Sequence, residues 1–220
     1  MPLTIDRTNC RLPPGQYYSR AQTKTAICLH HTVGGSATSS FRWWLDDPRV
    51  VGTAYLVERD GTVFEVFPPE CWAGHLACHD PALERQSIGI ELASEGALLE
   101  RDGNLWAFDG KKLLGGTEGL LANGRVVRLE RVWRGYRWFD AYEDLQVAAT
   151  VALVAELCDR FAIPRQLPAE VQWPAGDPRR YVGYAGIFHH ACVRADKSDL
   201  HPLMPWHRLE AALGVTRAAA

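Results

Sequence analysis

Residues 24–32 read Lys-Thr-Ala-Ile-Cys-Leu-His-His-Thr, and this stretch decides the fold. Its short apolar run with β-branched residues predicts a buried strand. The strand delivers two histidines, His30 and His31, to the loop that follows. Residues 186–188, Gly-Ile-Phe, lead in the same way into His189-His190. Because both histidine pairs directly follow apolar strands, we expect their imidazoles to converge at one edge of a sheet.

A third strand carries a single carboxylate. Residues 87–92 read Ser-Ile-Gly-Ile-Glu-Leu, an alternation that places the three larger apolar side chains on one face and Gly89 and Glu91 on the other. Glu91 therefore projects from the middle of a sheet otherwise lined by isoleucine. Burial there should raise the pKa of its carboxyl group, which suits a general acid or base.

Three segments predict helices. Ser36–Leu45 begins at a serine, and Pro205–Leu213 ends before a glycine. Residues 140–143 have capping-box spacing, and the apolar residues after them recur at helical intervals until Pro164. This last segment should be the longest helix and should pack on the sheet. Strands interleaved with helices indicate an α/β fold, a single domain with a mixed central β-sheet flanked by helices.

Two further regions contain hairpin signals. The apolar runs 51–58 and 62–67 flank Asp60-Gly61, a dipeptide typical of tight β-hairpins. Residues 95–138 are rich in Gly, Lys, Arg and Trp, and they include Asn123-Gly124, a second candidate hairpin turn. We interpret this second region as an excursion from the domain core.

Length and composition limit the class of protein. The chain has 220 residues, of which 47% are hydrophobic and 23% charged, with a formal net charge of −2. These values fit one globular domain. We divide the chain into an N-terminal extension (1–23), a domain over 24–214 with an insertion at about 95–138, and a tail (215–220). The near-neutral charge lacks the excess of basic residues that is typical of nucleic-acid-binding proteins. No stretch is apolar enough for a membrane span.

The histidine pairs suggest a metal. His189 is followed ten residues later by Asp199, and two histidines with one carboxylate are a known ligand set for a catalytic zinc ion, which keeps a fourth position open. The alternative is that these are ordinary surface or core histidines. The six cysteines form no C-x-x-C pair, so we expect free thiols.

Four motifs then occur in the order of one family. They are His30-His31-Thr32, the run 54–62 (Ala-Tyr-Leu-Val-Glu-Arg-Asp-Gly-Thr), the strand 87–92, and Lys197-Ser198-Asp199. With these motifs the chain resembles the type 2 zinc-dependent N-acetylmuramoyl-L-alanine amidases, relatives of the peptidoglycan recognition proteins and phage lysis amidases. The resemblance runs from about residue 24 to residue 202.

The resemblance implies a peptidoglycan-recognition-protein-like amidase fold with a Zn²⁺ ion in a groove. The implied reaction hydrolyses the amide between the lactyl group of N-acetylmuramic acid and L-alanine of the stem peptide. Carried over by position, the zinc ligands are His30, His189 and Asp199. Glu91 takes the place of the family's site glutamate, and Lys197 stands two residues before the last ligand.

The residue types suit this chemistry. Glu91 could deprotonate the attacking water and pass the proton to the leaving amine, while Lys197 offers a positive charge where the oxyanion develops. His190 replaces His189 as the ligand if the register differs by one residue. Cys192 is a soft donor, but it lies too soon after His189 for the family's cysteine ligand, so we interpret it as structural.

Several residues are candidates for substrate contact. Trp72 and His75 lie in a loop that also holds His79, and His31 and His190 could line the rim of the groove. Trp43 and Trp44 cannot share a helix face, so at least one of them belongs in the core, with Trp44 as a candidate for sugar stacking. The insertion offers a groove wall or the cover of a sheet edge, through its Trp and Lys residues Trp106, Lys111, Lys112, Trp133 and Trp138.

Two other functions remain open. A module that binds muropeptides without cleaving them would typically lack a zinc ligand, and a cysteine hydrolase would use Cys192 with a histidine. We expect peptidoglycan or a muropeptide as the partner of a monomeric chain. The first residues lack a signal-peptide pattern, so we expect synthesis in the cytoplasm, with action on cytosolic wall fragments or on cell wall after release or delivery.

Overall fold

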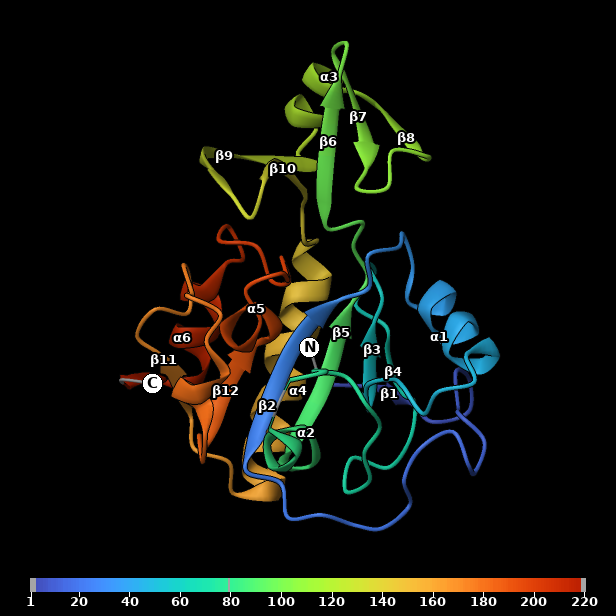
Figure 1. The fold of residues 1–220 in the computed structure, drawn as a ribbon, viewed down its shortest axis with the longest axis vertical. Helices are drawn as coiled ribbons and strands as arrows, with labels where there is room; N and C mark the ends of the chain where they lie inside the picture. The colour runs from blue at the N-terminus through green and yellow to red at the C-terminus, as the bar shows by residue number, and fades with distance from the viewer. Residues whose placement is uncertain (1–2, 79, 219–220) are drawn as a thin grey trace.

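A mixed six-stranded sheet forms the centre of the molecule (Figure 1). The computed structural model describes residues 3–78 and 80–218. In the order β1-β4-β3-β5-β2-β12, every neighbouring pair of strands is parallel except β3 with β4. The strands are β1 (Ile5–Asp6), β2 (Ala26–His31), β3 (Tyr55–Val57), β4 (Val63–Glu65), β5 (Ser87–Leu92) and β12 (Gly186–His189). The predicted fold class and the hairpin at Asp60-Gly61 are confirmed.

Helices cover both faces of this sheet. They are α1 (Ala37–Asp46), α2 (Pro81–Gln86), α4 (Asp144–Phe161), the 3₁₀ helix η1 (Pro178–Tyr181), α5 (His190–Val193) and α6 (Trp206–Leu213). The longest, α4, runs behind the sheet in Figure 1, and its buried side chains belong to the same hydrophobic cluster as Ile88, Ile90 and Leu92 of β5. The three helices expected from the sequence are therefore confirmed.

The two faces of the sheet differ in what covers them. Ile27 and Leu29 of β2 lie in the cluster with α4, whereas Ala26 and Cys28, which alternate with them, pack with Leu83 of α2. His30 continues this second row at the carboxyl end of the strand. Polar side chains therefore emerge where the helical cover of the second face ends.

The insertion forms a sheet of its own, above the central sheet in Figure 1. Its five antiparallel strands lie in the order β8-β7-β6-β10-β9. The elements are β6 (Ala97–Arg101), β7 (Asn104–Ala107), β8 (Leu113–Gly116), α3 (Thr117–Ala122), β9 (Val126–Trp133) and β10 (Tyr136–Asp140). The hairpin expected at Asn123-Gly124 is wrong, because these residues end α3, with Gly124 at φ +74°, a role that the same dipeptide also suits. The hairpin turn is Arg134-Gly135 instead.

Both ends of the described chain add strands. β1, from the expected N-terminal extension, forms the edge of the central sheet beside β4. β13 (Thr216–Ala218) pairs with β11 (Gln166–Pro168). All six cysteines are free thiols. Among residues 3–78 and 80–218, none of the helices combines the length and the apolar character that a bilayer crossing requires.

Asp140 does not cap α4, contrary to the capping-box pattern. The helix begins after Glu143, and the Asp140 carboxylate is fully buried. It accepts a hydrogen bond from the Glu95 backbone N–H at 2.6 Å and forms ion pairs with Arg59 and with Arg125. Asp140 therefore ties the two ends of the insertion to the turn between β3 and β4.

Asp140→Ala should lower the free energy of unfolding by about 3–5 kcal/mol, because it removes a fully buried carboxylate and leaves two partly buried arginines and the Glu95 N–H without their partner. Asp159→Ala is the control, since that carboxylate is 70% exposed beside Arg165 and such pairs contribute about 0–1 kcal/mol. Urea denaturation of both variants measures the difference. Equal losses would contradict this role of Asp140.

Candidate active site

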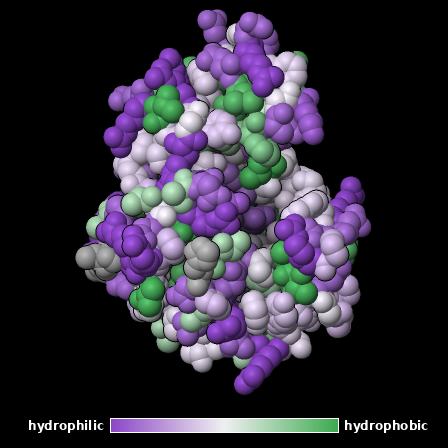
Figure 2. Space-filling view, in the orientation of Figure 1, coloured by the Kyte–Doolittle hydropathy of each residue, from purple (hydrophilic) through white to green (hydrophobic). Residues whose placement is uncertain are grey.

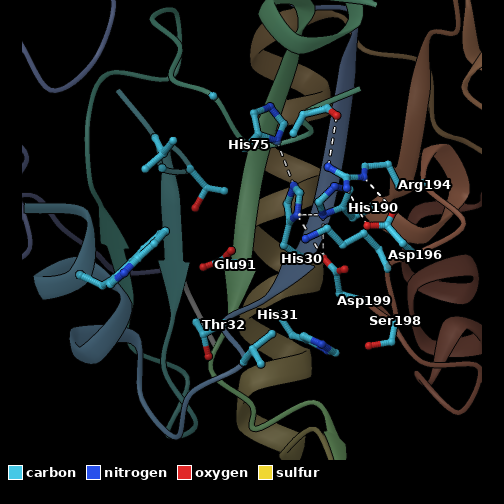
Figure 3. Close-up of a pocket in the computed structure, with 18 of the residues that line it drawn as sticks. His30, His31, Thr32, His75, Glu91, His190, Arg194, Asp196, Ser198 and Asp199 are labelled. Carbon is cyan, nitrogen blue, oxygen red and sulfur yellow. Dashed lines mark hydrogen bonds and ion pairs between the residues drawn. The ribbon is translucent and has the colours of Figure 1, made fainter. Parts of the chain in front are cut away.

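Three side chains meet at the carboxyl end of the central sheet (Figure 3). His30 ends β2, His190 begins α5, and Asp199 lies in the loop that follows α5. The Nδ1 atoms of the two histidines are 3.1 Å apart, and each lies 3.2 Å from Oδ2 of Asp199. All three residues are buried, so these atoms face one another out of bulk water.

His189 does not join this group, since its Nδ1 lies 3.0 Å from the backbone carbonyl of Asp199 and not beside the carboxylate. The expected convergence of His30, His189 and Asp199 is therefore wrong by one residue, and His190 takes the place of His189. In the parallel pair of β2 and β12, His189 stands opposite Leu29, so its side chain shares the face of Leu29. Its Nδ1 accepts the Leu200 N–H at 2.7 Å, and its Nε2 lies 2.7 Å from the carbonyl of Val171. Both ring nitrogens are occupied, which leaves His190 as the partner of His30.

The arrangement fits a zinc ion. The carbonyl of Leu76 lies 2.8 Å from Nε2 of His190 and can only accept a hydrogen bond. That nitrogen therefore carries a proton, and in the neutral ring Nδ1 presents a lone pair towards the Asp199 carboxylate. Ligand atoms around a tetrahedral zinc ion lie about 3.3 Å from one another when the bonds are about 2.0–2.1 Å. The observed separations match this spacing, and a cation relieves the repulsion between the facing lone pairs.

Burial sets the protonation of the neighbouring groups. It lowers the pKa of His30 to about 3, so that the ring is neutral at pH 7. Burial also raises the pKa of Asp199, but contacts with His190 and His30 outweigh it and hold that pKa well below the usual value. His30 and Asp199 thus have the charge states that metal ligands need.

Glu91 stands beside this group on β5. It pairs in register with His30, so both side chains emerge from the same face of the sheet. Burial raises the pKa of Glu91 to about 8, the charge of Asp199 adds to the rise, and Lys197 opposes it. Both Glu91 and Lys197 line the cavity that contains His30. A carboxyl group with this pKa can exchange a proton near neutral pH.

The other predicted contact residues lie in different places. His31 is buried and lies 3.0 Å from the Tyr142 hydroxyl. Trp44 is buried and its neighbour Trp43 is 55% exposed, and both line the cavity. Trp72 stacks on Tyr18, with ring centroids 4.1 Å apart. His75 lies against His30 and also lines the cavity, while His79 falls outside the described residues.

The cavity has a volume of about 570 Å³ and lies between the central domain and the insertion. Phe108, Arg134 and Tyr136 of the insertion line one side. Figure 2 shows hydrophilic side chains around the hollow in the middle of this face. The expected groove wall thus exists, but the tryptophans named for it serve elsewhere, since Trp133 and Trp138 are buried in the small sheet.

Cys192 is 1% exposed and packs in an apolar cluster with Phe188. It is not among the described residues that line the cavity. A buried thiol of this kind is inert, so the structure argues against Cys192 as the nucleophile of a cysteine hydrolase. It supports the structural role expected for this residue.

Sequence reasoning missed the lining residues of the insertion. Arg134 lies in the turn of the β9–β10 hairpin, and Tyr136 begins β10. The Arg134-Gly135 pair between two β-rich runs was the sequence signal that could have located this hairpin turn. Phe108 follows β7 and is 47% exposed. No pattern in the sequence places Phe108 in the groove, because its position depends on how the small sheet packs on the domain.

The sequence profile described as N-acetylmuramoyl-L-alanine amidase matches residues 20–202. This range includes His30, His190 and Asp199 together with Glu91 and Lys197. The chain belongs to the N-acetylmuramoyl-L-alanine amidase family. A search of curated proteins finds no match.

Solved amidase structures share the fold. The catalytic domain of XlyA superposes with a TM-score of 0.54 at 14% identity, covering 96% of this chain and 100% of that one. The N-acetylmuramyl-L-alanine amidase AmiD from E. coli gives a TM-score of 0.55 at 19% identity, over 94% of this chain and 62% of that one. A mutant endolysin from Bacillus subtilis gives a TM-score of 0.55 at 15% identity, over 96% of this chain and 99% of that one.

Glu91→Gln should change how stability depends on pH in the metal-free protein. Between pH 4.5 and 8 the native state keeps a proton on Glu91 that the unfolded chain has released. In that window Glu91 lowers the free energy of unfolding by about 1.4 kcal/mol per pH unit as the pH rises. The neutral amide of the variant does not titrate and so avoids this loss. The free energy of unfolding of the variant minus that of the wild type should therefore increase steadily from pH 4.5 to 8. Urea denaturation in EDTA measures it, and a constant difference would contradict the raised pKa.

His190→Leu and His189→Leu should have opposite effects. The first removes a ligand atom and should weaken zinc binding by more than about 100-fold. The second should leave zinc affinity nearly unchanged but lower the free energy of unfolding. It leaves the buried Leu200 N–H and Val171 carbonyl without a hydrogen-bond partner, which costs about 1–3 kcal/mol for each group. Competition with a chromophoric chelator and urea denaturation measure the two quantities. Loss of zinc binding in the His189 variant alone would restore the ligand set expected from the sequence.

Proposed function

We propose that this chain is a zinc-dependent amidase that hydrolyses the bond between the lactyl group of N-acetylmuramic acid and L-alanine of the stem peptide. The observation that carries the proposal is the convergence of one side-chain atom each from His30, His190 and Asp199, 3.1–3.2 Å apart. Family membership supplies the bond that is cleaved, and the donor set supports zinc.

The three donors would hold the ion, with His30 and His190 neutral and Asp199 ionised. Bound zinc supplies Lewis acidity towards the scissile carbonyl and lowers the pKa of water to about 7. Two imidazoles and one carboxylate leave one net positive charge on the centre. The three residues line the cavity, and a catalytic zinc ion held there would need a fourth position for water or substrate.

Glu91 moves the proton in this proposal. It takes a proton from the attacking water as the C–O bond forms, and it gives that proton to the L-alanine nitrogen as the C–N bond breaks. The same group serves in both steps because its surroundings leave its pKa within reach of neutral pH. The Lys197 side chain stabilises the negative charge that develops on the carbonyl oxygen, a contribution typically of about 10²–10³ in rate.

The cavity suits a substrate that is partly sugar and partly peptide. Trp43 and Phe108 expose apolar ring surface on its lining, and Arg134 and Arg194 add cationic groups. Stem peptides carry carboxylates, which such cations attract. The AmiD structure was determined with anhydro-N-acetylmuramic acid-L-Ala-D-γ-Glu-L-Lys, and we propose a muropeptide of this class, or the intact wall that contains it, as the substrate.

Removal of zinc with a chelator should abolish turnover of purified sacculi and of an anhydro-muropeptide, and added zinc should restore it. Glu91→Gln should still bind zinc but lose at least about 10²-fold in kcat, the usual contribution of a general base. Mass spectrometry identifies the product with a new L-alanine amino terminus. Asp159→Ala, far from the cavity on the exposed end of α4, is the activity control.

Full activity after complete chelation would contradict the metal dependence. Tight muropeptide binding by calorimetry, with no new amine released by the zinc-loaded protein, would identify a binding module in place of an enzyme. Comparing the two substrates also separates a preference for intact wall from one for released fragments.

A further inference from the structure

One short loop contacts both histidines that face Asp199. Nε2 of His30 lies 2.9 Å from Nδ1 of His75, and Nε2 of His190 lies 2.8 Å from the carbonyl of Leu76. Figure 3 shows His75 directly beside His30, on the side away from Asp199. Two consecutive residues therefore supply the outer partners of both rings.

The chain of hydrogen bonds beyond His75 has only one direction. The hydroxyl of Ser87 lies 2.7 Å from the carbonyl of Leu83, and a carbonyl can only accept, so the single proton of Ser87 points there. The Ser87 oxygen must then accept from Nε2 of His75, 3.1 Å away.

This order fixes the tautomer of both rings. With its proton on Nε2, neutral His75 has a bare Nδ1, which must accept from Nε2–H of His30. His30 in turn has a bare Nδ1, and that atom faces Asp199. Two backbone carbonyls, those of Leu83 and Leu76, thus determine that both ligand histidines present lone pairs to the same point.

The loop itself is anchored by a buried carboxylate. Glu84 of α2 is 9% exposed, and its two oxygens accept the backbone N–H groups of His75, Leu76 and Ala77 at 2.5, 2.7 and 3.1 Å. Arg194 adds a hydrogen bond to the carbonyl of Ala77 at 3.2 Å. These contacts hold the segment 75–77 rigidly against α2 and α5.

We propose that His75 is a positioning residue for the metal centre, and that Ser87 and Glu84 fix its tautomer and place. The inference rests on the proposed zinc-dependent function and deepens it. His75 acts through His30: it holds the ring plane and keeps the proton on Nε2, so that Nδ1 needs neither rotation nor deprotonation to bind the ion. Partners of this kind typically contribute about 10–100-fold to metal affinity.

The arrangement also excludes a competing use of the same atoms. Cys28, His30 and His75 could together hold an ion through Nε2 of His30. In the hydrogen-bond chain through Ser87 and His75, Nε2 of His30 carries a proton, and the Cys28 thiol points to the carbonyl of Leu29. The protein should therefore bind one zinc ion and not two.

The test compares His75→Ala with His75→Asn. The alanine variant removes the acceptor and should weaken zinc binding by about 10–100-fold. The asparagine side chain places its Oδ1 close to the position of Nδ1, accepts from His30, and should keep most of the affinity. Competition with a chromophoric chelator gives the dissociation constants, and the absorption of the cobalt-substituted protein reports ligand geometry without relying on turnover. Thermal unfolding of the metal-free variants separates folding from metal binding.

A second measurement needs no variant. Nitrogen-15 correlation spectra of the zinc-loaded wild type should show His75 as the neutral tautomer protonated on Nε2. Zinc binding by the alanine variant as tight as wild type, His75 protonated on Nδ1, or a stoichiometry of two zinc ions would each overturn the proposal. A wild-type protein that binds no zinc would instead overturn the proposed function, so the two failures are distinguishable.

Discussion

The parallel register of β2 with β5 and with β12 is the constraint on which the site depends. In a parallel pair, residues opposite one another point to the same face, so the side chains of His30 and Glu91 emerge side by side. His190 comes directly after β12, the strand on the other side of β2. A slip of one residue would turn His30 into the apolar core and bring Leu29 to the site. The packing of Ile27, Leu29, Ile88 and Ile90 against α4 makes that slip costly. The hydrophobic core therefore determines where the polar side chains lie.

Partial cover of the second face then sets the chemistry. α2, α5 and the loop around Leu76 close the lower part of this face, and the insertion overhangs the upper part, so the side chains at the strand ends are buried without being packed among apolar groups. Low polarity keeps His30 neutral and Glu91 protonated up to about pH 8. The same side chains on an open sheet edge would keep their ordinary pKa values, and Glu91 would then release its proton well below neutral pH.

Much of this could be predicted from the sequence, because it depends on local patterns. The alternation in β5 placed Glu91 on the face opposite the isoleucines, and the apolar runs before the two histidine pairs located β2 and β12. The choice between His189 and His190 could not be made, since it depends on which residue of β12 stands opposite Leu29. Asp140 was misassigned because its side chain suits more than one local role and long-range partners such as Arg59 decide between them. Asn123-Gly124 suits both a hairpin turn and a helix end, and here it ends α3.

The two adjacent histidines, His189 and His190, have different roles because their ring nitrogens have different hydrogen-bond partners. His189 has a backbone donor at Nδ1 and a backbone acceptor at Nε2, so the ring is satisfied by the fold alone and has no lone pair to offer. His190 has only its Nε2 satisfied, by the carbonyl of Leu76, and the remaining nitrogen points at a carboxylate that cannot donate. A buried lone pair without a donor is costly unless a cation or a proton is present. Such an unmatched nitrogen, more than the presence of a histidine in a motif, makes His190 and not His189 the candidate metal ligand.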